Sequence, residues 1–177
     1  MTTLQFKALQ YKVLESRVLN NLVFVSAAGL MATALFFEHA MGLAPCPLCI
    51  TQRIVVVALG LTGLTAALHN PTAKGYRRYG VALTTLGILG IGLAIRQLYI
   101  QSLPPGDMPA CLPGLDYLIE VMPLTDLLVV MFSGTGDCAE VQWTLLGLSI
   151  PGWTLLCFLG YSALGLFEVM RHRILPQ

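Results

Sequence analysis

Four long stretches of this chain are apolar around the whole helical circumference, and its polar positions gather between them. The stretches run over residues 22–37, 49–68, 79–99 and 151–170. A membrane-spanning helix needs ~20 mostly apolar residues, and a helix that is apolar on every side is buried or faces lipid. The pattern predicts an all-α membrane protein: a four-transmembrane-helix bundle that forms a single domain over residues 1–177.

The segments between these spans differ in charge, and the difference predicts an orientation. Eight of the ten Lys and Arg residues lie before the first span, between the second and third, or after the fourth. They are Lys7, Lys12, Arg17, Lys74, Arg77, Arg78, Arg171 and Arg173. Because basic residues are enriched on the cytoplasmic side, we expect both termini in the cytoplasm. The connections at about 38–48 and 100–150 then face outward.

Two shorter segments predict helices that do not cross the membrane. Residues 123–132 are apolar but too few to span, which is typical of a short helix lying in the plane of the interface. Residues 4–19 mix apolar and basic positions, and we expect them to form a separate surface helix on the cytoplasmic side.

Composition excludes several classes of protein. Charged residues make up 11% of the chain and hydrophobic residues 56%, whereas a soluble domain has about 25% charged residues. Such a chain is neither disordered nor a water-soluble globule. A net charge of +1 gives no reason to expect a nucleic-acid partner, so the expected surroundings are the lipid bilayer.

The cysteines are concentrated on the outward side. Cys46, Cys49, Cys111 and Cys138 lie in or beside the two outward connections, and Cys157 lies inside the fourth span. Outward compartments are oxidising, so paired cysteines there form disulfides or exchange them. We expect Cys157 to behave as a small hydrophobic residue.

A Cys-Pro-Leu-Cys motif at residues 46–49 opens the second span. Proline suits the first helical turn, and the positive end of the helix dipole favours a thiolate at Cys49. Arg53 follows one turn later on the same face. A zinc site would need a second close pair of Cys or His residues outside, and the sequence has none, so no metal is expected.

The cysteines at 111 and 138 have two interpretations. A structural disulfide closing this loop would stabilise the fold by ~3–4 kcal/mol. The Ser-Gly-Thr-Gly segment at 133–136 predicts a flexible hinge, which suits a cysteine that changes partner. A C-x-x-C on the same side favours the exchanging disulfide.

Two arginines are placed inside apolar spans near their outward ends. Arg53 lies one turn into the second span, and Arg96 lies one turn before the end of the third. Ionisable residues within spans are candidates for function, and two at a similar depth predict a shared polar pocket, which Gln52 and Gln97 could join. Snorkelling to the headgroups is the alternative for either arginine alone.

An exchanger in this position needs a two-electron acceptor. The chain has no flavin or nucleotide motif, and the motif at 46–49 borders the bilayer. A lipid-soluble quinone fits this requirement, because it can reach Cys49 laterally, while Arg53 can stabilise charge on its carbonyl oxygen.

The motifs together resemble the DsbB family, disulfide bond formation protein B. The resemblance rests on Cys-Pro-Leu-Cys followed by Arg53, on Gly-Asp-Cys-Ala-Glu at 136–140 with Gln-Trp at 142–143, and on Gly-Leu at 147–148 with Pro151. It covers the chain from about residue 15. It implies a membrane thiol oxidase that re-oxidises a periplasmic DsbA-like, thioredoxin-fold oxidase and passes electrons to ubiquinone or menaquinone. Disulfides would then be made de novo at the bacterial inner membrane, with the respiratory chain re-oxidising the quinol.

The resemblance also implies roles for individual residues. Cys111 would receive the attack of the DsbA-like partner, and Cys138 would be released to attack Cys46. Cys49 would remain as the thiolate that interacts with the quinone, and Arg53 matches the arginine of the family's quinone site.

The third span departs from one feature of the family. Some members carry a histidine near its outer end, close to the quinone, whereas this chain has Gln97 beside Arg96. We expect both residues near the quinone, with Gln97 limited to a neutral hydrogen bond.

Two other functions are compatible with part of the pattern. A protein like vitamin K epoxide reductase would run a quinone-linked thiol reaction the other way, but the long outward loop with two cysteines fits it less well. A four-span adaptor closed by inert disulfides, like a claudin, is the non-enzymatic alternative. A reactive thiolate at Cys46 or Cys49 would distinguish an enzyme from such an adaptor.

Overall fold

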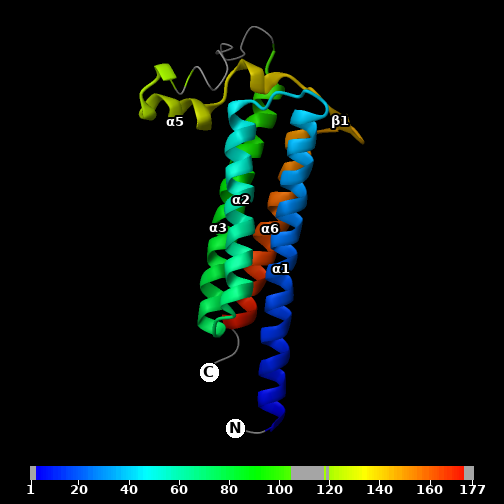
Figure 1. The fold of residues 1–177 in the computed structure, drawn as a ribbon, viewed down its shortest axis with the longest axis vertical. Helices are drawn as coiled ribbons and strands as arrows, with labels where there is room; N and C mark the ends of the chain where they lie inside the picture. Colours follow the sequence, from blue (N-terminus) through cyan, green and yellow to red (C-terminus); the bar gives the residue numbers. More distant parts are fainter. Residues whose placement is uncertain (1–2, 105–117, 119, 174–177) are drawn as a thin grey trace.

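The computed structural model describes residues 3–104, 118 and 120–173. Four long helices lie side by side, with both ends of the described chain at one end of the bundle (Figure 1). The elements are α1 (Thr3–His39), α2 (Pro47–His69), α3 (Ala73–Gln101), α5 (Leu124–Ser133), the 3-10 helix η1 (Gly136–Ala139), β1 (Thr144–Leu145), β2 (Leu148–Ser149) and α6 (Ile150–Arg173).

Four of these helices are long and apolar enough to cross a membrane. The spanning segments are Ser16–His39, Pro47–His69, Ala73–Gln101 and Ile150–Arg171. The prediction of an all-α, four-span membrane bundle is confirmed. Each segment extends beyond the predicted span, because the helical backbone continues past the apolar stretch at its ends.

The first helix differs from its prediction. Residues 4–19 do not form a separate surface helix, because α1 runs unbroken for 37 residues from Thr3 to His39. No Gly or Pro interrupts the chain before Gly29, so nothing in the sequence ends the helix at the membrane boundary.

The connection between α2 and α3 is shorter than the sequence pattern indicated. Asn70 adopts the left-handed conformation (φ 42°, ψ 57°) that ends α2, Pro71 follows, and α3 begins at Ala73. Residues 74–78, with three of the basic side chains, therefore belong to the first turns of α3 rather than to a loop.

Small residues allow α3 and α6 to pack closely. A Cβ atom at Gly80 would lie 2.9 Å from the carbonyl oxygen of Gly165, and one at Gly165 would lie 2.8 Å from that of Gly80. Further along the interface, the buried ring of Phe158 rests on Gly90. Such close backbone approach is typical of helices that associate within membranes.

Two polar bridges connect α1 to α6. The buried Asn20 side chain donates to both carboxylate oxygens of Glu168, at 2.9 and 3.1 Å. The hydroxyl groups of Ser26 and Tyr161 are hydrogen-bonded at 3.0 Å. Interhelical hydrogen bonds of this kind hold helices together where lipid offers no polar partner.

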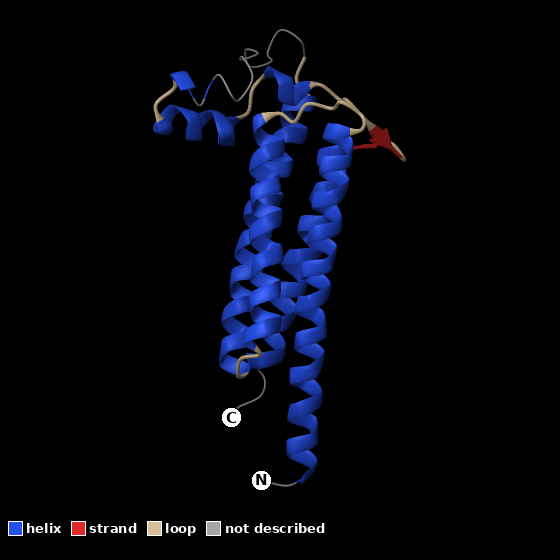
Figure 2. Ribbon diagram, in the orientation of Figure 1, coloured by secondary structure: helices blue, strands red, loops and turns tan. Residues whose placement is uncertain are grey.

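The end of the bundle opposite the termini carries the shorter elements (Figure 2). The helix expected at 123–132 is present as α5, which projects sideways from this end of the bundle, roughly perpendicular to the long helices (Figure 1). Its position at a membrane interface stays a prediction. The β1–β2 hairpin was not predicted, because strands of two residues carry no alternating pattern. Its turn places Leu146 and Gly147 at φ 53° and 79°, as in the tight turns that join hairpins.

Candidate functional site

Cys46 and Cys49 occupy the first turn of α2. Cys46 is the N-cap with extended backbone (φ −74°, ψ 164°), and Pro47 takes the first helical position, where its missing N–H costs nothing. The Cys46 sulfur accepts a hydrogen bond from the backbone N–H of Cys49 at 3.4 Å, and the two sulfur atoms lie 2.9 Å apart. The cap thus holds both sulfur atoms at the positive end of the helix dipole.

The helix η1 brings Cys138 to this same end of α2. Cys138 is 1% exposed, and its sulfur forms a hydrogen bond with the Cys46 thiol. Cys46 therefore contacts Cys49 on one side and Cys138 on the other, although Cys138 comes from a loop that follows α3 in the sequence.

The segment before Cys138 is closely packed rather than a flexible hinge, so that expectation is wrong. Gly134 has φ +81°, and a Cβ atom there would lie 2.6 Å from Leu48 and 2.8 Å from Ile100. Thr135 is 2% exposed. The glycine permits a close approach to α2 and α3, and this approach fixes the position of η1.

The contact between Cys46 and Cys138 polarises the two thiols in opposite directions. The hydrogen bond from Cys46 lowers the pKa of Cys138 to about 6, against the effect of burial, and hydrogen bonds from Thr135 and the backbone of Leu48 act in the same direction. The same pairing, with a second hydrogen bond to Cys49, raises the pKa of Cys46 above its ordinary value. Cys138 is thus the anionic member, and its thiolate faces the Cys46 sulfur.

Gln97 approaches the C-x-x-C pair from α3. Its side chain is 3% exposed, and its amide nitrogen donates to the Cys49 sulfur at 3.2 Å and lies 3.5 Å from the Cys46 sulfur. The sequence placed Gln97 near a quinone, and the structure places it against the sulfur atoms themselves.

A cavity of about 280 Å³ lies beside this pair, between α1, α2, α3 and α6 at the bundle end that carries the cysteines. Its wall is mostly apolar and includes Leu30, Met31, Phe37, Val56, Trp143 and Phe158. Cys49, Gln52, Arg53 and Gln97 line one side of it. The volume is close to the lower end of the ~300–1,000 Å³ range of small-molecule sites. The cavity can therefore hold a flat apolar ring with polar edges.

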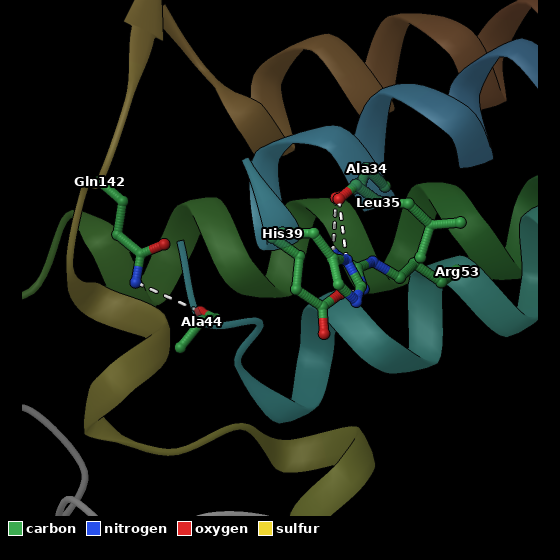
Figure 3. Close-up of polar contacts among 7 residues, drawn as sticks. Ala34, Leu35, His39, Ala44, Arg53 and Gln142 are labelled. Atoms are coloured by element: carbon green, nitrogen blue, oxygen red, sulfur yellow. Dashed lines mark hydrogen bonds and ion pairs between the residues drawn. The ribbon is translucent and has the colours of Figure 1, made fainter. Parts of the chain in front are cut away.

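Arg53 lines the cavity and is held by α1 (Figure 3). Its guanidinium forms an ion pair with Glu38 and donates to the carbonyl oxygen of Ala34 at 3.2 Å. Nearby, the Gln142 amide donates to the carbonyl oxygen of Ala44 at 3.3 Å (Figure 3). The Arg53 bonds join α2 to α1, and the Gln142 bond joins the segment after η1 to the connection between α1 and α2.

Arg96 does not share this pocket, so the expected pairing with Arg53 is wrong. Its side chain is exposed, it donates to the carbonyl oxygen of Ser133 at 3.1 Å, and it lies over the ring of Tyr99. Arg96 leaves α3 on a different side from its neighbour Gln97, because Arg96 is exposed and Gln97 is buried.

The remaining cysteines are placed as follows. Cys111 lies outside the described residues. Cys157 is partly exposed and lines the cavity from α6. Within residues 3–104, 118 and 120–173, no three His, Cys, Asp or Glu side chains gather closely enough to hold a metal ion.

Sequence reasoning missed several residues of the site. Glu38, which pairs with Arg53, was not among the predicted site residues, although its position directly after the first apolar stretch was an available signal. Thr154 hydrogen-bonds Gln52 from α6 at 2.7 Å, and Phe37 packs on Trp143 with ring centroids 4.9 Å apart. Both contacts join distant parts of the chain and carry no local pattern.

Comparison with known proteins identifies the family. The family described as "Disulfide bond formation protein DsbB" matches residues 16–167. The chain belongs to the DsbB family. Relatives named disulfide bond formation protein B include those of Hahella chejuensis, 51% identical over 85% of this chain and 92% of the relative, and of Marinobacter nauticus, 50% identical over 85% and 90%. "Disulfide bond formation protein B 1" of Pseudomonas aeruginosa is 41% identical over 85% and 93%.

Family membership supports a role in disulfide bond formation. This DsbB-family protein is a multi-pass membrane protein of disulfide bond formation, and the family name implies disulfide oxidoreductase activity. The resemblance noted from the motifs at 46–49 and 136–140 is thereby confirmed.

Proposed function

We propose that this DsbB-family protein is a thiol:quinone oxidoreductase that re-oxidises a periplasmic thioredoxin-like dithiol protein. Two disulfides, one involving Cys111 and Cys138 and the other Cys46 and Cys49, carry the electrons to a membrane quinone. The observation that supports this proposal best is the position of Cys46, whose sulfur contacts both Cys49 and Cys138.

The first exchange takes place in the long loop. A thiolate of the external dithiol attacks the sulfur of Cys111, the Cys111–Cys138 bond breaks, and its electron pair leaves on Cys138. The second external thiol then displaces Cys111, so the partner becomes a disulfide and the loop pair becomes reduced. Hydrogen bonds from Thr135 and the backbone of Leu48, which do not depend on a free Cys46 thiol, lower the pKa of Cys138 and favour its departure as a thiolate, because lower-pKa thiols leave faster.

The second exchange transfers the two electrons from the loop pair to Cys46 and Cys49. The Cys138 thiolate attacks Cys46, the Cys46–Cys49 bond breaks, and the electron pair leaves on Cys49. The Cys111 thiolate then attacks Cys138, which restores the loop disulfide and leaves Cys46 and Cys49 as a dithiol. The Gln97 amide, 3.2 Å from the Cys49 sulfur, stabilises negative charge on that sulfur.

The cavity fits the electron acceptor that this scheme requires. A bound quinone would supply an acceptor for two electrons and two protons. The apolar wall, with Phe37 and Trp143, suits its ring, and Arg53 presents a cation on the same cavity surface as Cys49. The Glu38 carboxylate and the Ala34 carbonyl keep the guanidinium in place.

The basic residues at the other end of the bundle support the orientation that the proposal requires. The first turns of α3 and the last turns of α6, which carry Arg77, Arg78 and Arg171, lie opposite Cys46 and Cys138. The positive-inside rule then favours a cytoplasmic position for both termini and a periplasmic position for the cysteine end.

The experiment is quinol formation by the purified full chain in detergent. A reduced thioredoxin-like dithiol protein and a soluble short-chain quinone are supplied, and quinone absorbance is followed. We expect continuous turnover by the natural sequence and none by Cys49→Ala, which retains the thermal unfolding midpoint of the parent protein.

Two results would reject the proposal. Absence of quinol with both a ubiquinone and a menaquinone analogue, together with cysteines that resist partner and alkylating agent, would favour a protein closed by inert disulfides. Undiminished turnover by Cys49→Ala would remove the C-x-x-C pair from the electron path.

A further inference from the structure

A chain of three hydrogen bonds crosses the bundle behind the C-x-x-C pair. The Thr154 hydroxyl on α6 donates to Oε1 of Gln52 at 2.7 Å. The amide nitrogen of Gln52, on α2, donates to Oε1 of Gln97 at 2.7 Å. The amide nitrogen of Gln97, on α3, donates to the Cys49 sulfur at 3.2 Å. The chain therefore connects three helices to one sulfur atom.

These groups are shielded from water, so they cannot exchange partners freely. Gln52 is 4% exposed and Gln97 is 3% exposed. A buried amide left without a partner is costly, so each glutamine is constrained to satisfy the next one. The first two links are 2.7 Å long, at the short end of the hydrogen-bond range.

The donor-to-acceptor direction of these hydrogen bonds determines whether the Cys49 sulfur faces an N–H group or a carbonyl oxygen. A primary amide has an NH₂ donor at one end and a carbonyl acceptor at the other. If both side-chain amides were rotated so that their oxygen and nitrogen exchanged places, Gln52 would donate to Thr154. Gln97 would then present its carbonyl oxygen to the Cys49 sulfur. An N–H group stabilises a thiolate, whereas a carbonyl oxygen repels it.

The Thr154 hydroxyl favours one of the two directions. Its single proton can be directed to Gln52 or to the carbonyl oxygen of Pro151, 3.1 Å away. The shorter contact is to Gln52, and donation there requires an oxygen at that end of the Gln52 amide. The donor end of Gln97 is then turned toward Cys49.

We propose that Gln52 and Thr154 are positioning residues that orient the Gln97 amide, so that its N–H group stabilises the thiolate released at Cys49. This proposal rests on the proposed function, in which the Cys138 thiolate attacks Cys46 and the electron pair of the Cys46–Cys49 bond leaves on Cys49. Gln97 itself touches the reacting sulfur and is a catalytic residue of this step.

The test measures that step alone. Oxidised full-length protein is mixed with the reduced dithiol partner without quinone, quenched in acid, and alkylated. The appearance of free Cys49 is followed by mass spectrometry. We expect Thr154→Val, which keeps the shape and removes the hydroxyl, to slow this rate about tenfold, and Thr154→Ser to restore it.

A second variant shows whether the residues act as one unit. Gln52→Met should slow the step about as much as Thr154→Val, and the double variant should be no slower than either, because both break the same chain. Thr85→Val is the matched control, since Thr85 is exposed on α3 and bonds only its own helix at 2.9 Å. It should release Cys49 at the rate of the parent protein.

Steady-state kinetics separate this proposal from a direct quinone role. The KM for a short-chain quinone is measured alongside, because Gln52 and Thr154 also line the cavity; the proposal requires that release of Cys49 be slowed in both variants even where no quinone is present. A raised KM with an unchanged rate of Cys49 release would overturn the proposal, and so would additive effects or a failure of serine to restore the rate. A parent protein that forms no quinol at all would instead reject the proposed function.

Discussion

The opposite polarisation of Cys46 and Cys138 can be tested by titration. We consider a variant in which Cys49, Cys111 and Cys157 are replaced by Ala, so that only Cys46 and Cys138 remain. The pKa of Cys138 is lowered to about 6, chiefly by the Cys46 thiol, and the pKa of Cys46 is raised. The thiolate absorbance near 240 nm should therefore rise through a midpoint of about pH 6, with the amplitude of one thiol.

Removing the Cys46 thiol, which donates the hydrogen bond to Cys138, should raise the pKa of Cys138 again. With Cys46 also replaced by Ala, the midpoint should move toward the ordinary value of about 8.5, although Thr135 and the backbone of Leu48 continue to lower it. At pH 7 a pKa of about 6 leaves roughly 90% of Cys138 as thiolate, whereas a pKa of about 8.5 leaves roughly 3%. The fraction of Cys138 present as thiolate at pH 7 should thus fall by up to about thirtyfold.

The sign of the pH dependence follows from the lowered pKa. Deprotonation is favoured in the folded protein, so stabilisation from this contact grows as pH rises from about 6 and is complete above the ordinary thiol value. It disappears below about pH 6. Both variants are titrated in detergent with a phosphine reductant present. Identical midpoints would refute the claim that the Cys46 thiol lowers the pKa of Cys138.

Three further predictions concern the cavity, the bundle and the loop. Arg53→Ala should raise the KM for a soluble quinone about tenfold, because it removes a charge-assisted donor from the cavity. Gly165→Val should destabilise the bundle by about 1–3 kcal/mol, because the α3 backbone leaves no space for a side chain; thermal unfolding measures this. Gly134→Ala should slow release of Cys49 at least several-fold, because the residue has a positive φ and contacts α2 and α3.

Matched controls make these predictions specific. Gly160 lies on α6 with no neighbour within 4 Å, so Gly160→Val should change the unfolding midpoint little. Gly147 has a similar positive φ without neighbours, so Gly147→Ala should leave Cys49 release unchanged. A parent-like quinone KM in Arg53→Ala would remove that residue from the acceptor site.

Local sequence pattern predicted the spans and the environment of the C-x-x-C pair. Apolar length marked the four helices, and Pro47 after Cys46 indicated the start of α2. The N-terminal start of α1 was not predictable in this way, because a helix that extends out of the bilayer needs no change of backbone conformation. Local propensity favours continuation until Gly or Pro intervenes.

The parts that depended on side-chain direction were predicted less well. Depth along a span placed Arg53 and Arg96 together, but the faces of α2 and α3 that carry them point to different neighbours. The composition at 133–136 suggested flexibility, whereas Gly134 serves close packing against Leu48 and Ile100. Glycine permits both, and only the surrounding atoms decide which one applies.

The bridge between Asn20 and Glu168 has a consequence for how the chain is completed during synthesis. Asn20 lies on the first helix to emerge and Glu168 on the last, 148 residues later. Until α6 arrives, the buried face of α1 presents an amide with no carboxylate to bind, although α1 and α2 can already associate. The Asn20 amide still donates to the carbonyl oxygen of Ser16 within α1 at 2.9 Å, but its bond to α6 is missing, and a polar group within the bilayer is costly unless it is fully paired. A chain that ends before α6 therefore lacks the polar contact between its first and last helices. We expect such a chain to be less stable at the bundle end opposite the cysteines.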